Sequence, residues 1–257
     1  MNRTGLLIAL AIAVVVGIVF AIWPGLDLAL SGLFYDATGK RWRVLDWPSG
    51  IVRDLAAWLI ALIAAPAFIA LLVKLVLPRR PLLVPGRAVL LMISTLALGP
   101  GLVVNVILKD NSGRPRPMYV TEFGGKEKFL PWWDLRGDCT KNCSFVAGEP
   151  SGAFWTMAPA AVAPPHWRVA AYGAALVFGA AVGVLRMSLG GHFFTDVVFG
   201  AVVVFLLIWM VHGLLYRWRS TRLTDAGVEH VLERIATPGY DAVMRIAARI
   251  RGAAPKS

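Results

Sequence analysis

Three cationic side chains are spaced so that they could bind one oxyanion together. Lys109 and Arg116 lie seven residues apart in one polar segment, and Arg186 lies at the end of a later apolar run. A lysine ammonium offers a point charge, whereas an arginine guanidinium offers a planar fork that matches two phosphate oxygens. Any one of these residues alone would read as an ordinary residue at the end of a membrane span. Together they predict a phosphate-binding site.

A histidine and an aspartate follow the third cation. His192 and Asp196 are four residues apart, so they share one face where a helix begins. A carboxylate bonded to one imidazole nitrogen fixes the tautomer and leaves the other nitrogen free as a nucleophile. Phosphoryl transfer needs little beyond such positioning and the neutralisation of charge on the phosphate oxygens. Because the sequence has no carboxylate cluster suited to a divalent metal, we expect neither a metal nor another cofactor.

The segment before the fourth apolar run offers further donors. Residues 148–151 read Gly-Glu-Pro-Ser, and Pro150 is suited to the first turn of a helix. Free N–H groups at a helix start lie at the positive end of the helix dipole and favour an anion. We therefore add Gly148 and Ser151 to the expected phosphate-binding residues.

Two cysteines, Cys139 and Cys143, lie four residues apart in the same outer segment. A metal site would normally recruit more cysteine or histidine ligands, and residues 108–149 contain no histidine. In an oxidising compartment a disulfide is the favoured state of such a pair. We expect this disulfide to stiffen the approach to the anion site.

The elements that must position these residues are membrane spans. The chain is 58% hydrophobic and 16% charged, with a mean hydropathy of +0.67, whereas soluble domains are about a quarter charged. Uncharged runs of 17 to 22 residues are long enough to cross about 30 Å of hydrocarbon. The first run is too long for a signal peptide, so we expect it to be a retained helix. We predict an all-α polytopic membrane protein with six spans, at residues 5–26, 55–73, 88–108, 150–167, 169–185 and 197–216.

Six spans place the segments after spans one, three and five at the same face of the membrane. The three cations and His192 are therefore expected to converge at one surface, whichever end of the chain is inside. Lys and Arg residues near span ends favour a cytoplasmic N-terminus and C-terminus by 14 to 12, which places the site in the periplasm. The margin is small because three of the outer cations have a chemical use.

We divide the chain into two N-terminal spans with an outer interfacial loop (1–87), a four-span core (88–216) and a basic tail (217–257). The tail has two apolar stripes, separated by a break at Pro238-Gly239. Such a pair of amphipathic helices would lie on an anionic inner leaflet, or equally well pack on the inner loops. We therefore assign the net charge of +11 to topology, lipid and substrate, and expect no nucleic acid partner.

These patterns resemble the motifs of the type 2 phosphatidic acid phosphatase (PAP2) superfamily, the membrane lipid phosphatases related to vanadium haloperoxidases. The first family motif, a lysine followed by six residues and Arg-Pro, matches Lys109 through Arg116-Pro117 in full. The third motif is Ser-Arg, five residues, His, three residues and Asp. Its arginine, histidine and aspartate are all present, with Leu185 in place of the leading serine.

The resemblance implies a haloperoxidase-like helical bundle and metal-independent dephosphorylation. It further implies a phosphohistidine intermediate on His192, with Asp196 orienting that imidazole. Lys109, Arg116 and Arg186 would bind the phosphate.

The second family motif, Pro-Ser-Gly-His, is incomplete, because this segment has no histidine. Cys-Ser-Phe commonly precedes the motif, which would align Val146 to Glu149 with it and put Glu149 in the place of the histidine. Alternatively, Pro150 to Ala153 matches three of its four residues and leaves Ala153 there. The family uses this histidine as the acid for the leaving group and the base for water, so Glu149 is the expected substitute in the first register.

The surrounding residues also resemble a bacterial subgroup that includes lipid A phosphatases. We expect a phosphoric monoester hydrolase or pyrophosphatase of the bacterial inner membrane that acts on a lipid headgroup. Lipid A phosphate, at the 1-position, or a polyprenyl pyrophosphate such as undecaprenyl pyrophosphate is favoured, because these leaving groups need less protonation than a simple alkoxide. The alternative is a lipid-phosphate-binding protein whose catalysis is impaired by loss of the second-motif histidine.

Overall fold

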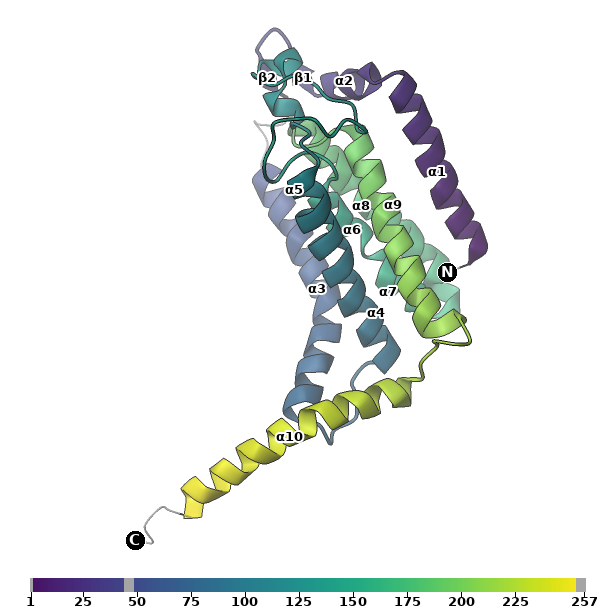
Figure 1. Ribbon diagram of the computed structural model, residues 1–257, viewed down its shortest axis with the longest axis vertical. Coiled ribbons are helices and arrows are strands. Elements are labelled where there is room, and N and C mark those ends of the chain that lie inside the picture. The colour runs from purple at the N-terminus through teal and green to yellow at the C-terminus, as the bar shows by residue number, and fades with distance from the viewer. Residues whose placement is uncertain (1, 44–48, 253–257) are drawn as a thin grey trace.

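The computed structural model describes residues 2–43 and 49–252, which form a long helical bundle with one helix projecting from its end (Figure 1). In that part of the chain the only strands are β1 (Tyr35–Asp36) and β2 (Arg41–Trp42), which pair antiparallel. The predicted all-α class is thus confirmed.

The helices in chain order are α1 (Arg3–Ile22), α2 (Gly25–Gly32), α3 (Ser49–Val76), α4 (Gly86–Leu96), the π-helix η1 (Ala97–Leu108), α5 (Lys109–Asn111), the 3₁₀ turns η2 (Pro117–Tyr119) and η3 (Thr121–Phe123), α6 (Gly148–Phe154), α7 (Met157–Val162), α8 (Pro165–Ser188), α9 (Phe194–His212), the π-helix η4 (Gly213–Arg217) and α10 (Asp225–Gly252).

In the described part of the chain, five helical segments are long and apolar enough to cross a membrane. They are α1, α3, the continuous run α4–η1–α5, α8 and the run α9–η4. Their outer faces carry large apolar side chains that are well exposed, including Leu7 at 66%, Trp58 at 74% and Val177 at 70%. Such faces are unfavourable in water and favourable in lipid. The chain is therefore a multi-pass membrane protein.

The sixth span, predicted at 150–167, is not confirmed as a long helix. This stretch is divided between α6 and α7, which are separated at Trp155, and α8 begins already at Pro165. Pro159 has no N–H group to donate to the carbonyl of Trp155, which accepts from Ala158 at 2.8 Å instead. The proline thus offsets α7 from α6.

The α6–α7 pair lies inside the bundle, where it packs along α8. It still runs from one end of the bundle to the other. Its first residue, Gly148, lies beside Lys109, whereas Ala161 near its end packs with Leu91 of α4 and Leu215 of η4. The segments after α5 and after α8 therefore meet at the same end, as the span parity requires.

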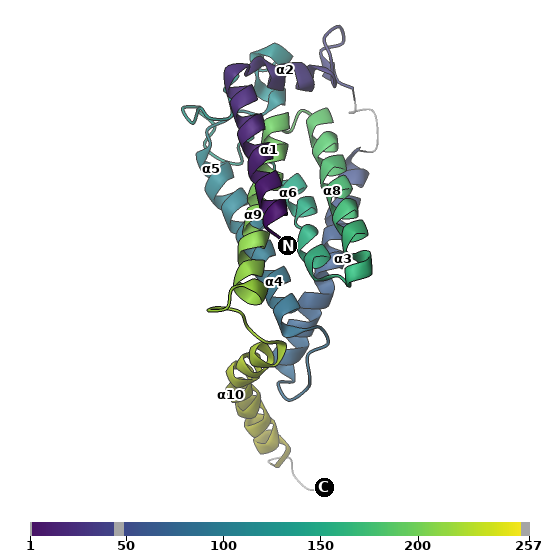
Figure 2. The ribbon, with the colours of Figure 1, turned by 90° about the vertical axis from the view of Figure 1, so that its right-hand side faces the viewer.

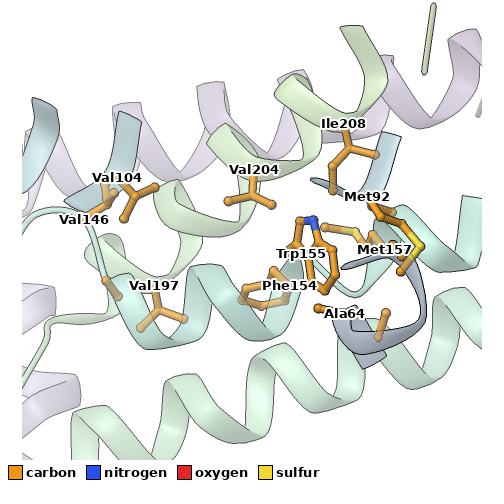
Figure 3. Close-up of a cluster of buried hydrophobic side chains, with 14 of the residues drawn as sticks. Ala64, Met92, Val104, Val146, Phe154, Trp155, Met157, Val197, Val204 and Ile208 are labelled. Atoms are coloured by element: carbon orange, nitrogen blue, oxygen red, sulfur yellow. The ribbon is translucent and has the colours of Figure 1, made fainter. Parts of the chain in front are cut away.

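The main core lies between α4, α6–α7 and α9 (Figure 3). Trp155 is fully buried among Met92, Val204 and Ile208. Its indole Nε1 donates a hydrogen bond of 3.0 Å to Oγ1 of Thr95, which satisfies the polar end of the ring in an apolar setting. This core fixes α6 relative to the spans that carry the cations.

The outer loop after α1 contains the short helix α2, which lies across the end of the bundle (Figure 1). Trp42 from β2 is buried, and its ring packs at 5.4 Å from Tyr35 and 5.2 Å from Phe123. This loop is therefore a packed cap on the bundle rather than only an interfacial segment. Residues 44–48 of the loop lie outside the described residues.

The break expected at Pro238-Gly239 is wrong, because α10 is one continuous helix through Pro238. Its first half lies against the ends of α3 and α4 (Figure 2), and ion pairs fix it there. Lys74 of α3, which is 1% exposed, lies 3.2 Å from both Glu229 and Glu233. A helix held from one side in this way tolerates the loss of the single backbone hydrogen bond that a proline removes. The second half of α10 extends away from the spans.

Gly179 provides a test of the α6–α8 packing. A Cβ atom there would lie 2.2 Å from Cδ1 of Phe154, so Gly179→Ala forces the ring out of its place. We expect a loss of about 1–3 kcal/mol and a thermal midpoint in detergent lower by several degrees. Gly173→Ala is the matched control, because Gly173 lies in the same helix with open space around it. Equal or higher stability of Gly179→Ala than of Gly173→Ala would contradict this packing.

Candidate active site

Lys109 and Arg116 meet at one residue of the outer loop. Lys109 begins α5 at the end of the π-helix η1, and Arg116 immediately precedes η2. Nζ of Lys109 and Nη2 of Arg116 both donate to Oδ1 of Asn142, at 3.0 and 2.8 Å. The two cations are therefore held at the same oxygen atom despite their mutual repulsion.

Arg186 joins this end of the bundle from the last turn of α8. Its Nε lies 2.6 Å from Oε2 of Glu149, as an ion pair without the alignment of a hydrogen bond. Oε1 of Glu149 lies 4.0 Å from Nε of Arg53. Gly191 leaves room for the guanidinium, since a Cβ there would lie 2.6 Å from Nη2 of Arg186.

His192 is fully buried in the turn between α8 and α9. Its Nδ1 lies 2.8 Å from the carbonyl oxygen of Ser144. Because a carbonyl can only accept, Nδ1 carries the hydrogen and Nε2 keeps a lone pair. Among the described residues, Nε2 has no hydrogen-bond partner.

The surroundings of His192 favour a neutral imidazole. Burial lowers its pKa below the ordinary 6.5; Asp196 opposes this shift, and the charges of Lys109 and Arg116 add to it. The ring is therefore uncharged at neutral pH, as a nucleophile must be.

The direct hydrogen bond expected between Asp196 and His192 is replaced by an indirect one. Oδ2 of Asp196 lies 3.8 Å from Nδ1 of His192, which is too long for a hydrogen bond. The same oxygen accepts from Oγ of Ser144 at 2.5 Å and from the N–H of Phe193 at 2.8 Å. Ser144 thus lies between the two residues, with its hydroxyl on the carboxylate and its carbonyl on the imidazole.

Sequence reasoning missed Arg114, which is the centre of a buried network. Its side chain is 1% exposed, and it pairs with Oδ2 of Asp27 at 2.7 Å and with Oδ1 of Asp196 at 2.5 Å. It also donates to Oγ1 of Thr195 at 2.8 Å and to the carbonyl of Leu130 at 2.9 Å. The N-terminal helix α2, the outer loop and α9 are joined through this one guanidinium.

One part of this network left a signal in the sequence. Asp27 is the only charged residue of α2, whose sequence is GLDLALSG, and a lone carboxylate in an apolar helix needs a partner. Arg114 itself carries no such signal, because it stands among other polar residues inside the first motif.

The structure brings Gly148 and Glu149 to the cations. A Cβ on Gly148 would lie 3.1 Å from Nζ of Lys109, so the start of α6 and the ammonium approach closely. The side chain of Glu149 is 44% exposed beside Arg186. Both residues therefore belong to the surface that the cations share.

Ser151 and Ala153 are not part of that surface. The hydroxyl of Ser151 donates to the carbonyl of Ala147 at 2.6 Å, and it faces Gly200 of α9, where a Cβ would lie 2.7 Å from it. Ala153 is completely buried within the bundle. A hydroxyl on the buried side of α6 packs against α9 rather than facing the anion site.

The remaining residues of interest close the outer loop. Cys139 and Cys143 are joined by a disulfide, with their Cα atoms 5.8 Å apart. Within the described residues, no three His, Cys, Asp or Glu side chains gather in a way that could hold a metal ion. The site offers three cations, the neutral imidazole of His192 and the carboxylate of Glu149. The cations can bind a tetrahedral oxyanion, and the imidazole can attack its central atom.

Residues 88–222 match the PAP2 superfamily, and the chain belongs to this family. The match begins at α4 and includes every site residue named above from the first and third motifs. A bundle of membrane helices with this site defines a membrane lipid phosphatase of the PAP2 type, which is a phosphoric monoester hydrolase.

Curated relatives of this chain carry the name Lipid A 4'-phosphatase. The protein of Francisella tularensis subsp. novicida (strain U112) is 35% identical over 219 residues, which cover 84% of this chain and 98% of the relative. The protein of Rhizobium leguminosarum is 32% identical over 206 residues, covering 73% and 87%. The protein of Rhizobium etli is 38% identical over 116 residues, covering 44% and 45%. No solved structure matches the chain significantly.

The buried network predicts that Arg114→Met is strongly destabilising. The substitution leaves the carboxylates of Asp27 and Asp196 buried without their cation, which costs about 3–5 kcal/mol. Arg136→Met is the matched control, because Arg136 pairs with Asp134 in the same outer loop but its side chain is 83% exposed. Thermal unfolding in one detergent compares them. If both variants melt together with the wild type, Arg114 does not hold these elements together.

Proposed function

We propose that this protein removes the 4'-phosphate of lipid A through a phosphohistidine on His192. The observation that carries the proposal is the buried, neutral His192, whose Nε2 has no hydrogen-bond partner among the described residues. It lies close enough to Lys109 and Arg116 for their charges to lower its pKa. A nucleophile beside converging cations is the arrangement that phosphoryl transfer requires.

The reaction would proceed in two steps, formation of the phosphohistidine and its hydrolysis. Nε2 of His192 attacks phosphorus, and the bond to the sugar oxygen breaks. The substrate phosphate takes the place of Glu149 beside Arg186, so Glu149 reacts as the carboxylic acid and gives its proton to the leaving alkoxide. The Glu149 carboxylate then takes a proton from water, whose oxygen attacks phosphorus and breaks the P–N bond. Phosphate leaves, and His192 and Glu149 return to their starting states. Lys109, Arg116 and Arg186 balance the charge on the phosphate oxygens throughout.

Glu149 is the preferred acid–base residue because of where the two candidate registers place their residues. Glu149 lies in the shared surface, 2.6 Å from Arg186, whereas Ala153 is completely buried within the bundle. This supports the register in which Glu149 takes the place of the family histidine.

The substrate assignment draws on the relatives, whose name specifies the 4'-position of lipid A. A phosphate at this position is an ester of an ordinary sugar hydroxyl. Its alkoxide leaves poorly unless it is protonated, so an acid such as Glu149 is needed. The 1-phosphate and the polyprenyl pyrophosphate have better leaving groups and remain the substrates to test against it.

The orientation in the membrane is part of the same proposal. A periplasmic site of an inner-membrane protein, with both termini in the cytoplasm, agrees with the distribution of Lys and Arg. It places α10 at the inner surface. There its exposed apolar residues Val243 and Ile246 and the neighbouring Arg245 and Arg249 suit an anionic leaflet.

His192→Ala is expected to abolish phosphate release from lipid A, since it removes the nucleophile. Phosphate release is measured in one detergent with lipid A labelled at the 4'-position, lipid A labelled at the 1-position and undecaprenyl pyrophosphate. His230→Ala, a histidine exposed on α10, is the matched control and should match the wild type.

Unchanged turnover by His192→Ala would rule out the phosphohistidine. A wild-type protein that binds lipid A but releases no phosphate from any member of the panel would instead favour the impaired lipid-phosphate-binding alternative.

Glu149→Gln is expected to lower kcat on lipid A by about 10²–10⁴-fold, as the loss of a general acid and base does. The loss should be smaller on p-nitrophenyl phosphate, because nitrophenolate leaves without a proton. Glu122→Gln, at an exposed position of the outer loop, controls for the change of charge. Equal losses on the two substrates would mean that Glu149 does not protonate the leaving group.

A further inference from the structure

The disulfide-closed loop is attached to the first-motif segment along most of its length. The N–H of Cys143 donates to the carbonyl of Lys109 at 3.0 Å, and the N–H of Cys139 donates to the carbonyl of Gly113 at 3.3 Å. Ser144, which follows Cys143, donates its N–H to the carbonyl of Arg114 at 2.8 Å. The two segments therefore move as one unit.

Asn142 is the residue of this loop that touches the cations. Its Oδ1 accepts from Nζ of Lys109 at 3.0 Å and from Nη2 of Arg116 at 2.8 Å. Its backbone carbonyl accepts from Nη2 and Nε of Arg116 at 3.0 and 3.2 Å. Its own N–H donates to Oδ1 of Asp110 at 3.0 Å. Both oxygen atoms of one neutral residue are thus used to hold two cations.

The chemistry of an amide suits this task. Two cations that must converge on one phosphate repel each other, and an oxygen with a partial negative charge between them reduces that repulsion. A carboxylate would do so more strongly, but it would also compete with the phosphate for the same donors. An amide oxygen holds the cations together and leaves their full charge for the ligand.

The backbone at Asn142 shows how the loop presents this amide. Its φ of +53° lies in the left-handed region, which asparagine tolerates better than most residues other than glycine. The disulfide between Cys139 and Cys143 closes the loop around it. The residue type, the backbone conformation and the crosslink all serve to place one side chain.

The same stretch of chain also holds the nucleophile. Directly after the disulfide, the carbonyl of Ser144 accepts from Nδ1 of His192 at 2.8 Å and its hydroxyl donates to Asp196 at 2.5 Å. The phosphate-binding cations and the attacking imidazole are therefore set by residues only two positions apart.

We propose that Asn142 is a positioning residue that holds Lys109 and Arg116 convergent for phosphate, and that the Cys139–Cys143 disulfide keeps it in place. The proposal rests on the proposed function only in that the site binds a phosphate group. It makes anion affinity depend on an uncharged residue outside the three family motifs.

Asn142→Asp separates this role from a merely structural one. A carboxylate of the same shape keeps both contacts, so the thermal midpoint should stay equal to the wild type or rise. The same carboxylate competes with phosphate, so KM and the inhibition constant of orthovanadate should rise about tenfold or more, with a smaller change in kcat. Asn111→Asp is the control, because it adds the same charge at an exposed residue at the same end of the bundle. The amide of Asn111 donates to the carbonyl of Ile107 and not to the cations. This variant should leave KM and the vanadate inhibition constant near wild type.

Asn142→Gly keeps the left-handed backbone but removes Oδ1. We expect KM and the vanadate constant to rise about fivefold. Dithiothreitol should have a similar effect on the wild type. It passes two electrons and two protons to the disulfide, gives two thiols at Cys139 and Cys143, and itself closes to a cyclic disulfide. Reduction should add little to the effect of Asn142→Gly, because the contact has already been removed.

Vanadate binding can be measured without lipid turnover, so the two proposals fail separately. A wild type that binds vanadate but does not dephosphorylate lipid A would overturn the proposed function and leave the comparison of variants intact. A folded Asn142→Asp protein with wild-type KM and vanadate affinity would overturn the role of Asn142. Unchanged vanadate affinity of the reduced wild type would overturn the role of the disulfide.

Discussion

Arg114 carries a charge where water does not reach, and Asp27 and Asp196 on either side of it make this possible. The first carboxylate comes from the cap formed by α2, and the second from the start of α9. A buried ion of this kind is tolerated only if nearly all of its donors are satisfied. The requirement fixes the outer loop, the cap and the last span relative to one another, and the geometry of the active site follows from it.

The first consequence concerns Asp196, which faces Arg114 with one oxygen and Ser144 and Phe193 with the other. Its carboxylate reaches His192, the proposed nucleophile, through Ser144 rather than by direct contact. The imidazole of His192 is therefore oriented by a backbone carbonyl, whose position is set by the outer loop. Changes in that loop would reach the chemistry without altering any motif residue.

The sequence predicted that Lys109, Arg116 and Arg186 gather at one end, because motif spacing and span parity are local and additive properties. Placing these three cations together required no knowledge of tertiary contacts. The sequence wrongly added Ser151, whose hydroxyl donates to the carbonyl of Ala147. It did not predict the hydrogen bond that Nδ1 of His192 donates to the carbonyl of Ser144, since a carbonyl has no side-chain signature. It also divided α10 at Pro238, although Lys74 and its two glutamates hold that helix from the side. Tertiary contacts of this kind are invisible to periodicity, and they account for the buried α6–α7 pair as well.

The distance in sequence between the partners of the cap has a consequence for biogenesis. Asp27 is made 87 residues before Arg114 and 168 residues before Thr195. At about 5–20 residues per second, the last of these partners leaves the ribosome roughly ten to thirty seconds after Asp27. Until then Asp27 lacks the N–H and the hydroxyl of Thr195, and the cap has no partner on α9. Insertion of α9 is thus the event that locks the α2 cap into place.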